Sequence, residues 1–267
     1  MITLDRPTKF TIPTLLNLIK RRGGEAHQTF SEVPTFYDET AERTLDQQVN
    51  AVLTENGLMG ARGMDRDLLS LVESISHPQL EYYGWFDGEF EDGSPANYSV
   101  LVGSGSGGGF GLIRVAGEDT VTVQRQRSDL LLQTFLDMIP QSRGANGQPL
   151  VTSKSEFESG RSASAEDETQ RSIMRSAPGR SEQLSPLKEM QRILKAPRTG
   201  AGSLYVAARP NGGRRRRSPR PLNFIDVSEG RWLMEERPGR DDSLVVFTPG
   251  TPQVIGERIR NAQSALG

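Results

Sequence analysis

The sequence predicts an α+β fold in which two similar halves join antiparallel sheets and cover one face of them with helices. Three observations lead to this prediction. Amphipathic helix patterns flank runs of short strands, only turn residues separate successive strands, and the same order of elements occurs twice within 267 residues. A pseudo-two-fold axis would then relate the halves.

Two helices are expected at the start of the first half. In residues 38–53 apolar side chains recur every three or four positions, and Gly57 supplies the stop. Residues 65–76 show the same spacing, and Pro78 ends that pattern. Two amphipathic helices are therefore expected before the first strand.

An antiparallel meander follows these helices. Short strand-like runs cover residues 80–86, 98–102, 110–115 and 120–123, and Gly, Asp and Ser turns separate them. Ser128 is then expected to cap a helix that continues to about Ile139, with apolar residues on its buried side.

The second half repeats this order. A helix is expected at residues 186–194, strands at 203–208, 223–227, 231–236 and 243–247, and a last helix at 252–265. Residues 98–138 and 223–262 both contain three strands, their turns and a capped helix, so an internal duplication is the simplest explanation.

We expect a single domain over residues 1–267, formed by halves 1–140 and 186–267. The polar connector, residues 141–185, is rich in Ser, Arg and Glu and is expected to be mobile or loosely helical.

Composition excludes several classes of protein. The chain has no cysteine and a net charge of −2, which argues against thiolate chemistry and against a nucleic-acid binder with a broad basic face. No apolar run is long enough for a membrane span, and the N-terminus is unlike a signal peptide, so a cytoplasmic protein is expected.

No credible catalytic or cofactor site is found. The two histidines, His27 and His77, form no metal-binding pair, and neither a G-x-S-x-G motif nor a P-loop is present. A G-x-G-x-x-G pattern at Gly103, Gly105 and Gly108 precedes a strand, where a dinucleotide site needs a helix, so a hairpin connection is favoured. A nucleotide-binding or small-molecule enzyme that uses residues 103–109 remains the alternative.

Two loops suggest a role in protein binding. Residues 214–217 are four consecutive arginines without interleaved aromatics, which favours a solvated or protein-docking loop over a nucleic-acid site. The equivalent loop of the first half, residues 87–95, is acidic and carries Phe90 at its tip. An exposed aromatic inside a charged rim is typical of a docking loop, although Phe90 could equally fold back on the sheet.

Several segments together resemble the EspG family of type VII (ESX) secretion chaperones. They are DETAERTLDQQVNAVLTENGL, HPQLEYYGWFD, RSDLLLQTFLDMIP and the C-terminal NFIDVSEGRWLMEERPGRDDSLVVFTPGTPQVIGERI. Within the last, the spacing of Asp226, Gly230, Arg231 and Trp232 is fairly specific. The polar connector and the arginine run depart from the family pattern.

The resemblance implies a non-catalytic cytosolic chaperone that needs no cofactor and binds the tip of the PPE subunit in PE–PPE heterodimers, keeping them soluble. It also implies a contact surface formed by the central sheet, the loop at 87–95 and a helical bundle drawn from residues 128–139 and 157–194. The candidate partner-binding residues are Asp87, Glu89, Phe90, Glu91, Asp92, Leu132, Phe135, Phe157 and Met174. Neither nucleic acid nor a membrane is an expected partner, and a weak homodimer is left open.

Overall fold

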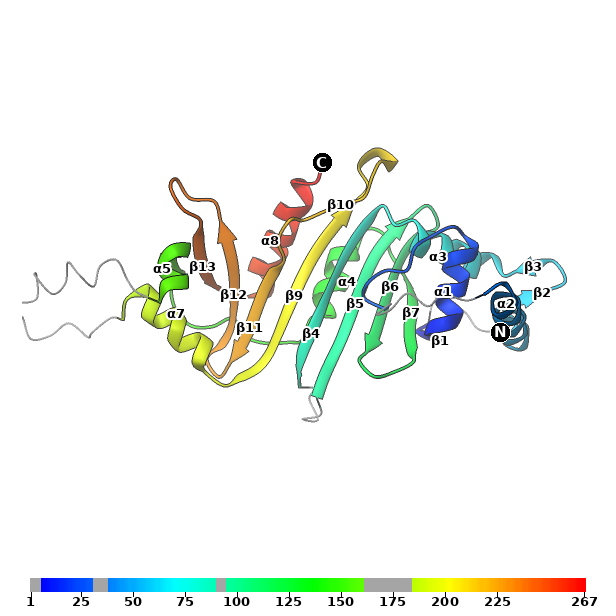
Figure 1. Cartoon of the computed structure of the whole chain (residues 1–267), viewed down its shortest axis with the longest axis horizontal. Coiled ribbons are helices and arrows are strands. Elements are labelled where there is room, and N and C mark those ends of the chain that lie inside the picture. Colours follow the sequence, from blue (N-terminus) through cyan, green and yellow to red (C-terminus); the bar gives the residue numbers. More distant parts are fainter. Residues whose placement is uncertain (1–5, 31–37, 90–94, 161–183) are drawn as a thin grey trace, which may run out of the picture. The chain divides into compact units, whose positions relative to one another are not determined.

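The computed structural model describes residues 6–30, 38–89, 95–160 and 184–267 (Figure 1). Within these residues, eleven strands form one antiparallel sheet and two short strands pair separately. The predicted α+β class is confirmed. The strand order along the sheet is β1 (Thr8–Thr11), β7 (Thr120–Gln126), β6 (Gly108–Val115), β5 (Pro95–Gly105), β4 (Leu80–Glu89), β9 (Arg198–Ala208), β11 (Leu222–Val227), β12 (Gly230–Arg237), β13 (Leu244–Pro249) and β8 (Leu150–Ser153); β10 (Arg216–Arg217) pairs with β9, and β2 (Met59–Gly60) pairs with β3 (Gly63–Met64).

The chain divides into two compact units. Unit 1 contains Met1–Gln141, Gly202–Arg220 and Gly256–Gly267, and unit 2 contains Ser142–Ala201 and Pro221–Ile255. The boundary at residues 201 and 202 falls within β9, so each unit includes part of that strand.

Side-chain caps and proline fix the ends of the helices. Asp38 and Asp65 accept hydrogen bonds from the first backbone N–H groups of α2 and α3, as Ser185 does for α7, which begins at Pro186. None of the helices in the described residues is both long and apolar enough to cross a membrane. The α-helices described are α1 (Ile12–Arg21), α2 (Glu39–Glu55), α3 (Arg66–Ser76), α4 (Leu131–Asp137), α5 (Lys154–Ser159), α7 (Pro186–Lys195) and α8 (Pro252–Ser264).

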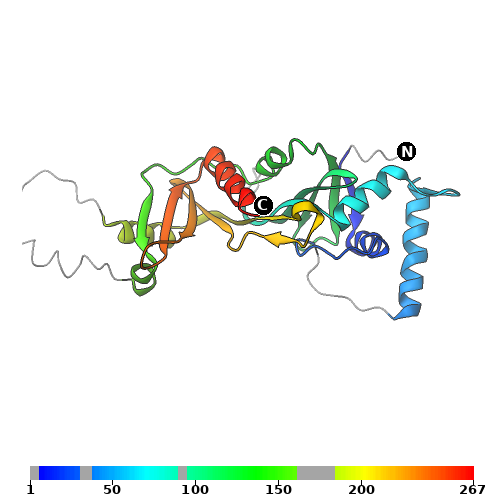
Figure 2. The ribbon, with the colours of Figure 1, turned by 90° about the horizontal axis from the view of Figure 1, so that it is seen from above.

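Helices cover both faces of the strands in unit 1, and the prediction of one covered face is wrong for this unit. Successive strand residues point to opposite faces, so Tyr82 and Tyr83 mark the two sides of β4. Tyr83 belongs to the core formed with α1, α2 and α3. Tyr82 stacks on Phe135 of α4 and donates a hydrogen bond to Gln263 of α8. Figure 2 shows α1 and α4 on opposite sides of these strands.

Two further predictions for unit 1 are wrong. Strand β1 precedes all the helices, because its four residues pair with the edge of β7 over Thr8↔Val123 to Thr11↔Thr120. Ser128 does not cap a helix: it lies in a turn in which the Leu130 N–H donates to the Arg127 carbonyl, and α4 begins only at Leu131.

Unit 2 is built around the hairpin of β11 and β12. Asp226 lies opposite Arg231, and their buried side chains form a bidentate ion pair with both N–O distances at 2.7 Å. The Arg231 guanidinium also lies 3.9 Å from the centre of the Phe224 ring. Gly230 adopts a φ of 120°, and a Cβ there would lie 2.8 Å from the Arg143 carbonyl oxygen. The Asp-Gly-Arg-Trp spacing therefore encodes a tight turn with a buried charge pair.

The connector contains more regular structure than predicted. Strand β8 pairs with β13 over Leu150↔Phe247 to Ser153↔Leu244, and α5 follows directly, capped by Ser153. Pairing with the edge strand β13 satisfies backbone N–H and C=O groups of this polar segment, although the segment has no apolar core of its own. Residues 161–183 of the connector lie outside the described residues.

Candidate functional site

The predicted docking loop joins two paired strands of unit 1. Strands β4 and β5 pair as far as Glu89↔Pro95, so the acidic segment forms the end of a hairpin, and Asp87 and Glu89 are exposed on β4. Phe90, Glu91 and Asp92 lie outside the described residues. The hairpin is confirmed, whereas the aromatic anchor stays a prediction.

The predicted contact residues on α4 differ in exposure. Leu132 is half-buried, whereas the Phe135 side chain is fully buried and its ring centroid lies 5.9 Å from that of Tyr82. Phe135 therefore holds α4 against β4 from inside the fold, and its ring is not exposed to a partner in this structure.

The other two predicted contact residues belong to unit 2. Phe157 on α5 is half-buried, with its ring centroid 6.1 Å from that of Phe247 on β13. Met174 lies outside the described residues. A site that combines Phe157 and Met174 therefore stays a prediction.

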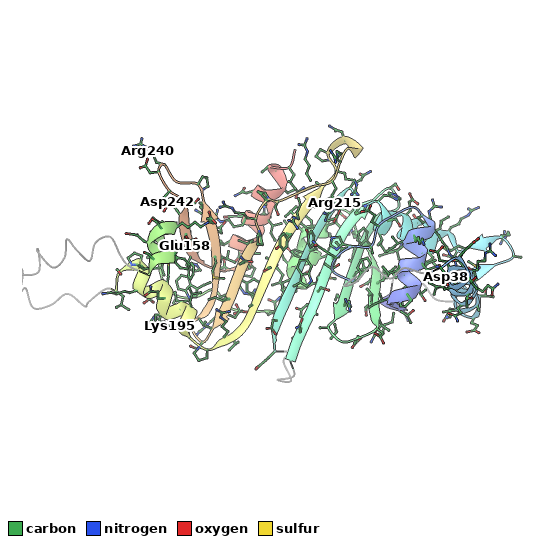
Figure 3. The ribbon with its side chains drawn as sticks, in the orientation of Figure 1. Asp38, Glu158, Lys195, Arg215, Arg240 and Asp242 are labelled. Atoms are coloured by element: carbon green, nitrogen blue, oxygen red, sulfur yellow. The ribbon has the colours of Figure 1, made fainter. Side chains whose placement is uncertain are left out.

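A charged cluster in unit 1 was missed by the sequence analysis. Glu81 on β4 is only 1% exposed, and Arg215 holds its carboxylate through Nε at 2.9 Å and Nη2 at 2.7 Å (Arg215 is labelled in Figure 3). His27 Nε2 lies 3.3 Å from Oε2, and Arg209 Nη1 lies 3.8 Å from Oε1. One buried acid thus contacts three basic side chains from distant parts of the sequence.

The electrostatics of this cluster stabilise the charged forms. Burial raises the pKa of the Glu81 carboxyl, but the hydrogen bonds from His27 and Arg215, together with the charge of Arg215, outweigh burial and lower the pKa to about 2. The hydrogen bond to Glu81 likewise raises the pKa of Arg215 against the effect of burial. Both groups therefore stay charged at neutral pH and form an ion pair.

The segment after α1 closes over the cluster. The His27 ring packs against Tyr83 at an interplanar angle of 79°, with the ring centroids 4.6 Å apart, and Gln28 donates a hydrogen bond to the Tyr83 hydroxyl at 3.1 Å. Ser99 on β5 donates to the Thr29 carbonyl at 2.5 Å. These contacts fix residues 25–30 on the same face of β4 as Glu81.

Aromatic rings continue this face beyond Glu81. Because strand side chains alternate, Tyr83 and Trp85 follow Glu81 on the same side of β4. Tyr205 of β9 stacks on Tyr83 with a centroid distance of 5.2 Å and an interplanar angle of 9°. The Trp85 ring is nearly perpendicular to both, at interplanar angles of 84° and 88°. Arg217 lies over the Tyr205 ring at 5.3 Å. Tyr205 and Trp85 remain partly exposed.

A hollow of about 450 Å³ opens beside the cluster in unit 1. Basic and neutral polar groups dominate its lining, and the acids in it are Glu25 and the already paired Glu81. No group of three or more His, Cys, Asp or Glu side chains in the described part of the chain could hold a metal ion. The side chains that line the hollow are Glu25, Ala26, His27, Gln28, Ile75, Ser76, His77, Pro78, Glu81, Leu101, Arg209, Arg215 and Arg217.

The glycine-rich segment is explained by packing against α3. It forms the β5–β6 hairpin, whose last pair is Gly105↔Gly108, as the hairpin prediction required. A Cβ on Gly107 would lie 2.0 Å from the Ser70 carbonyl oxygen, and one on Gly105 would lie 2.8 Å from the Ser74 Cα. The glycines thus permit close contact with α3 and do not lead into a helix N-terminus that could hold a phosphate. This geometry argues against the nucleotide-binding alternative.

The comparisons with known proteins point to one family. Residues 15–261 match the EspG family. No curated protein sequence matches the chain significantly.

The structure is also similar to a solved chaperone complex. The chain matches a structure described as the Mycobacterium tuberculosis type VII secretion system chaperone EspG5 in complex with a PE25-PPE41 dimer, with a TM-score of 0.65 and 14% sequence identity. The match covers 98% of this chain and 97% of the other. At this identity the likeness concerns the fold.

Proposed function

Because the chain belongs to the EspG family, we propose that it is a chaperone of type VII secretion that binds a PE–PPE-type heterodimer in the cytoplasm and keeps it soluble for secretion. The observation that carries this proposal is the family match over residues 15–261. It agrees with the prediction of a non-enzymatic EspG protein made from the sequence. The likeness to EspG5, solved with PE25-PPE41, supports the same class of client.

The physical requirements of such a chaperone agree with this fold. A client with an exposed apolar tip needs a cover that excludes water and prevents self-association. The chaperone must also release its client, and an interface of moderate size with one buried anchor residue and a charged rim allows such reversible binding. The acidic end of the β4–β5 hairpin supplies a rim of this kind.

For the contact surface we propose the 87–95 loop, with Phe90 as the anchor and Asp87, Glu89, Glu91 and Asp92 as its rim. Leu132 on α4 would extend the surface, and Phe135 would support it from inside the fold. In the family-derived helical bundle, Phe157 and Met174 would provide further apolar contacts.

We also propose that the fold arose by duplication of the halves 1–140 and 186–267, which form a single EspG-like domain. The element order β5, β6, β7, α4 matches the order β11, β12, β13, α8. Residues 98–138 and 223–262 should then superpose with the same handedness of connections. Opposite handedness would contradict a duplication.

The proposal is tested by co-expression with PE–PPE pairs from the same genome and pull-down through a tag on this chain. We expect one or more pairs to be retained, and we expect Phe90→Ala to reduce retention strongly. Val52→Ala is the control, since Val52 lies on α2 and is 45% exposed. If no pair is retained, the client class is wrong. If Phe90→Ala behaves like the control, the contact lies outside the 87–95 loop.

A further inference from the structure

The connection from β9 to β11, residues 209–220, concentrates positive charge. It contains six arginines and no acid, in a chain whose net charge is −2. Two of these arginines, Arg209 and Arg215, face Glu81. In the residues that the structure describes, Arg214, Arg216 and Arg217 are exposed and form no ion pair with a carboxylate. The like charges of such a cluster repel one another and destabilise the folded state, unless an anionic partner binds to them.

Strand pairing and an ion pair restrain this arginine loop. Its strand β10 pairs with β9 through Arg216↔Ala208 and Arg217↔Ala207. The Ser218 N–H donates to the Val206 carbonyl at 2.8 Å, and Arg215 is fixed on the buried Glu81. A partner would therefore bind arginines that are already positioned, which lowers the entropic cost of binding.

The exposed Arg217 and the partly exposed Tyr205 and Trp85 favour a ligand with a carboxylate beside an apolar group. The Arg217 guanidinium lies 5.3 Å from the centre of the Tyr205 ring, and Arg217 is exposed, so its N–H groups are accessible to an acceptor. Trp85 adds a partly exposed apolar surface next to that ring. We propose that residues 209–220 form a docking surface for an acidic segment of a partner protein, in which Arg217 binds a carboxylate and the Tyr205 and Trp85 rings contact a neighbouring apolar side chain.

The ring arrangement favours protein over nucleic acid. Tyr83 stacks on the Tyr205 ring from β4, and Arg217 lies over it from β10, which pairs with β9 on the other side. Both ring faces of Tyr205 are thus occupied, and the Trp85 ring stands nearly perpendicular to the Tyr205 ring. Binding of single-stranded nucleic acid uses free aromatic faces on which bases stack, and this surface offers none on Tyr205.

The inference deepens the proposed function and rests on it to this extent: in the chaperone complex, the client would supply the acidic segment. It adds a basic contact on the arginine loop to the predicted contact of the acidic 87–95 loop.

The first test uses a fluorescein-labelled peptide of alternating Glu and Leu and an oligouridylate of equal net charge, with binding measured by anisotropy on the full chain. We expect the peptide to bind more tightly than the RNA, and Arg217→Gln to weaken peptide binding about fivefold. Binding should also weaken with added salt. Arg240, labelled in Figure 3, lies in the loop between β12 and β13. Arg240→Gln removes the same charge there and should leave peptide binding unchanged.

Three results would overturn the inference. The first is that Arg217→Gln and Arg240→Gln change peptide binding equally, and the second is that the RNA binds more tightly than the peptide and depends on Arg217 in the same way. The third is a homodimer of the free chain that Arg217→Gln dissociates, which would place a second copy on this surface. Arg217 is exposed, so the variant should fold, and its thermal transition checks this.

The second test separates the inference from the proposed function. With a PE–PPE pair retained in the pull-down, Arg217→Gln should raise the dissociation constant of the pair about fivefold relative to Arg240→Gln. If the pair binds both variants equally, the chaperone function stands and the arginine surface is wrong. If no pair binds and the peptide result holds, the client class fails and the acidic-protein surface stands.

Discussion

Glu81 is a single buried acid that connects three segments of unit 1. Its carboxylate accepts hydrogen bonds from Arg215 of the arginine loop and contacts His27 of the segment after α1, while its own backbone lies in β4. A buried charge is tolerated only when its partners remain in place. The conformation of the arginine loop therefore depends on this residue of β4 as well as on the pairing of β10 with β9.

Replacement of Glu81 by Gln should destabilise the protein strongly. The change leaves Arg215, whose side chain is 32% exposed, without the buried carboxylate, and breaking such a pair costs about 3 kcal/mol. Urea denaturation at pH 7 measures the loss. The control is Glu229→Gln, which breaks a pair with Arg192 in which both side chains are more than a third exposed, and it should cost less than about 1 kcal/mol. Equal losses would show that Glu81 contributes no more than a surface acid.

The same carboxylate predicts how stability depends on pH. The pKa of Glu81 falls from an ordinary value of 4.5 to about 2 in the folded protein, so the unfolded chain takes up the proton first as the pH decreases. Stability from Glu81 is fully present above about pH 4.5 and is lost as the pH falls toward 2. The full contribution of Glu81 to the free energy of unfolding is about 3 kcal/mol.

Urea unfolding of the wild type and of Glu81→Gln between pH 7 and pH 3 measures this effect. The difference in free energy of unfolding should shrink as the pH falls. A difference that stays constant over this range would contradict the low pKa.

Residue patterns could have revealed only part of this cluster. Glu81 lies in an aromatic strand on the same face as Tyr83, which signals an acid that needs a buried partner. The partner could not be predicted, because Arg215 lies 134 residues away and is one of four consecutive arginines. Only the pairing of β10 with β9 decides which of them faces Glu81.

At the scale of elements, periodicity predicted most helices and strands. Helices α2, α3, α7 and α8 and strands β4 to β7 and β11 to β13 lie where the sequence predicted them, within a few residues. Their apolar spacing and caps are local properties. Strands β1 and β8 were missed, since each has four residues and forms by pairing with an edge strand that a local pattern does not reveal.

The β5–β6 hairpin tests the packing role of the glycines. Gly107→Ala should destabilise the protein by about 2 kcal/mol, because its Cβ would overlap the backbone of α3 at Ser70. Thermal or urea unfolding measures this loss. Gly60→Ala is the matched control, since a Cβ there meets no atom within 4 Å, and it should be nearly neutral. A neutral Gly107→Ala would mean that the hairpin does not pack on α3.

For the whole molecule, the two loops that the proposed duplication would make equivalent carry opposite charge. The loop at residues 87–95 contains four acids and no base, whereas the loop at 209–220 contains six arginines and no acid. If the halves arose by duplication, their binding surfaces have since become different. A pair of identical surfaces would bind two clients, whereas one acidic and one basic surface suit two different parts of one client.

The proposed complex should therefore contain one copy of this chain, one PE subunit and one PPE subunit. Size-exclusion chromatography with light scattering on the purified complex measures its mass, and the free chain run at the same concentration provides the reference. Binding should also raise the unfolding temperature of the chain, because a client that binds only the folded state stabilises it by mass action. A complex with two clients per chain would mean that both halves keep the same binding surface, and the charge difference between the loops would then have another cause.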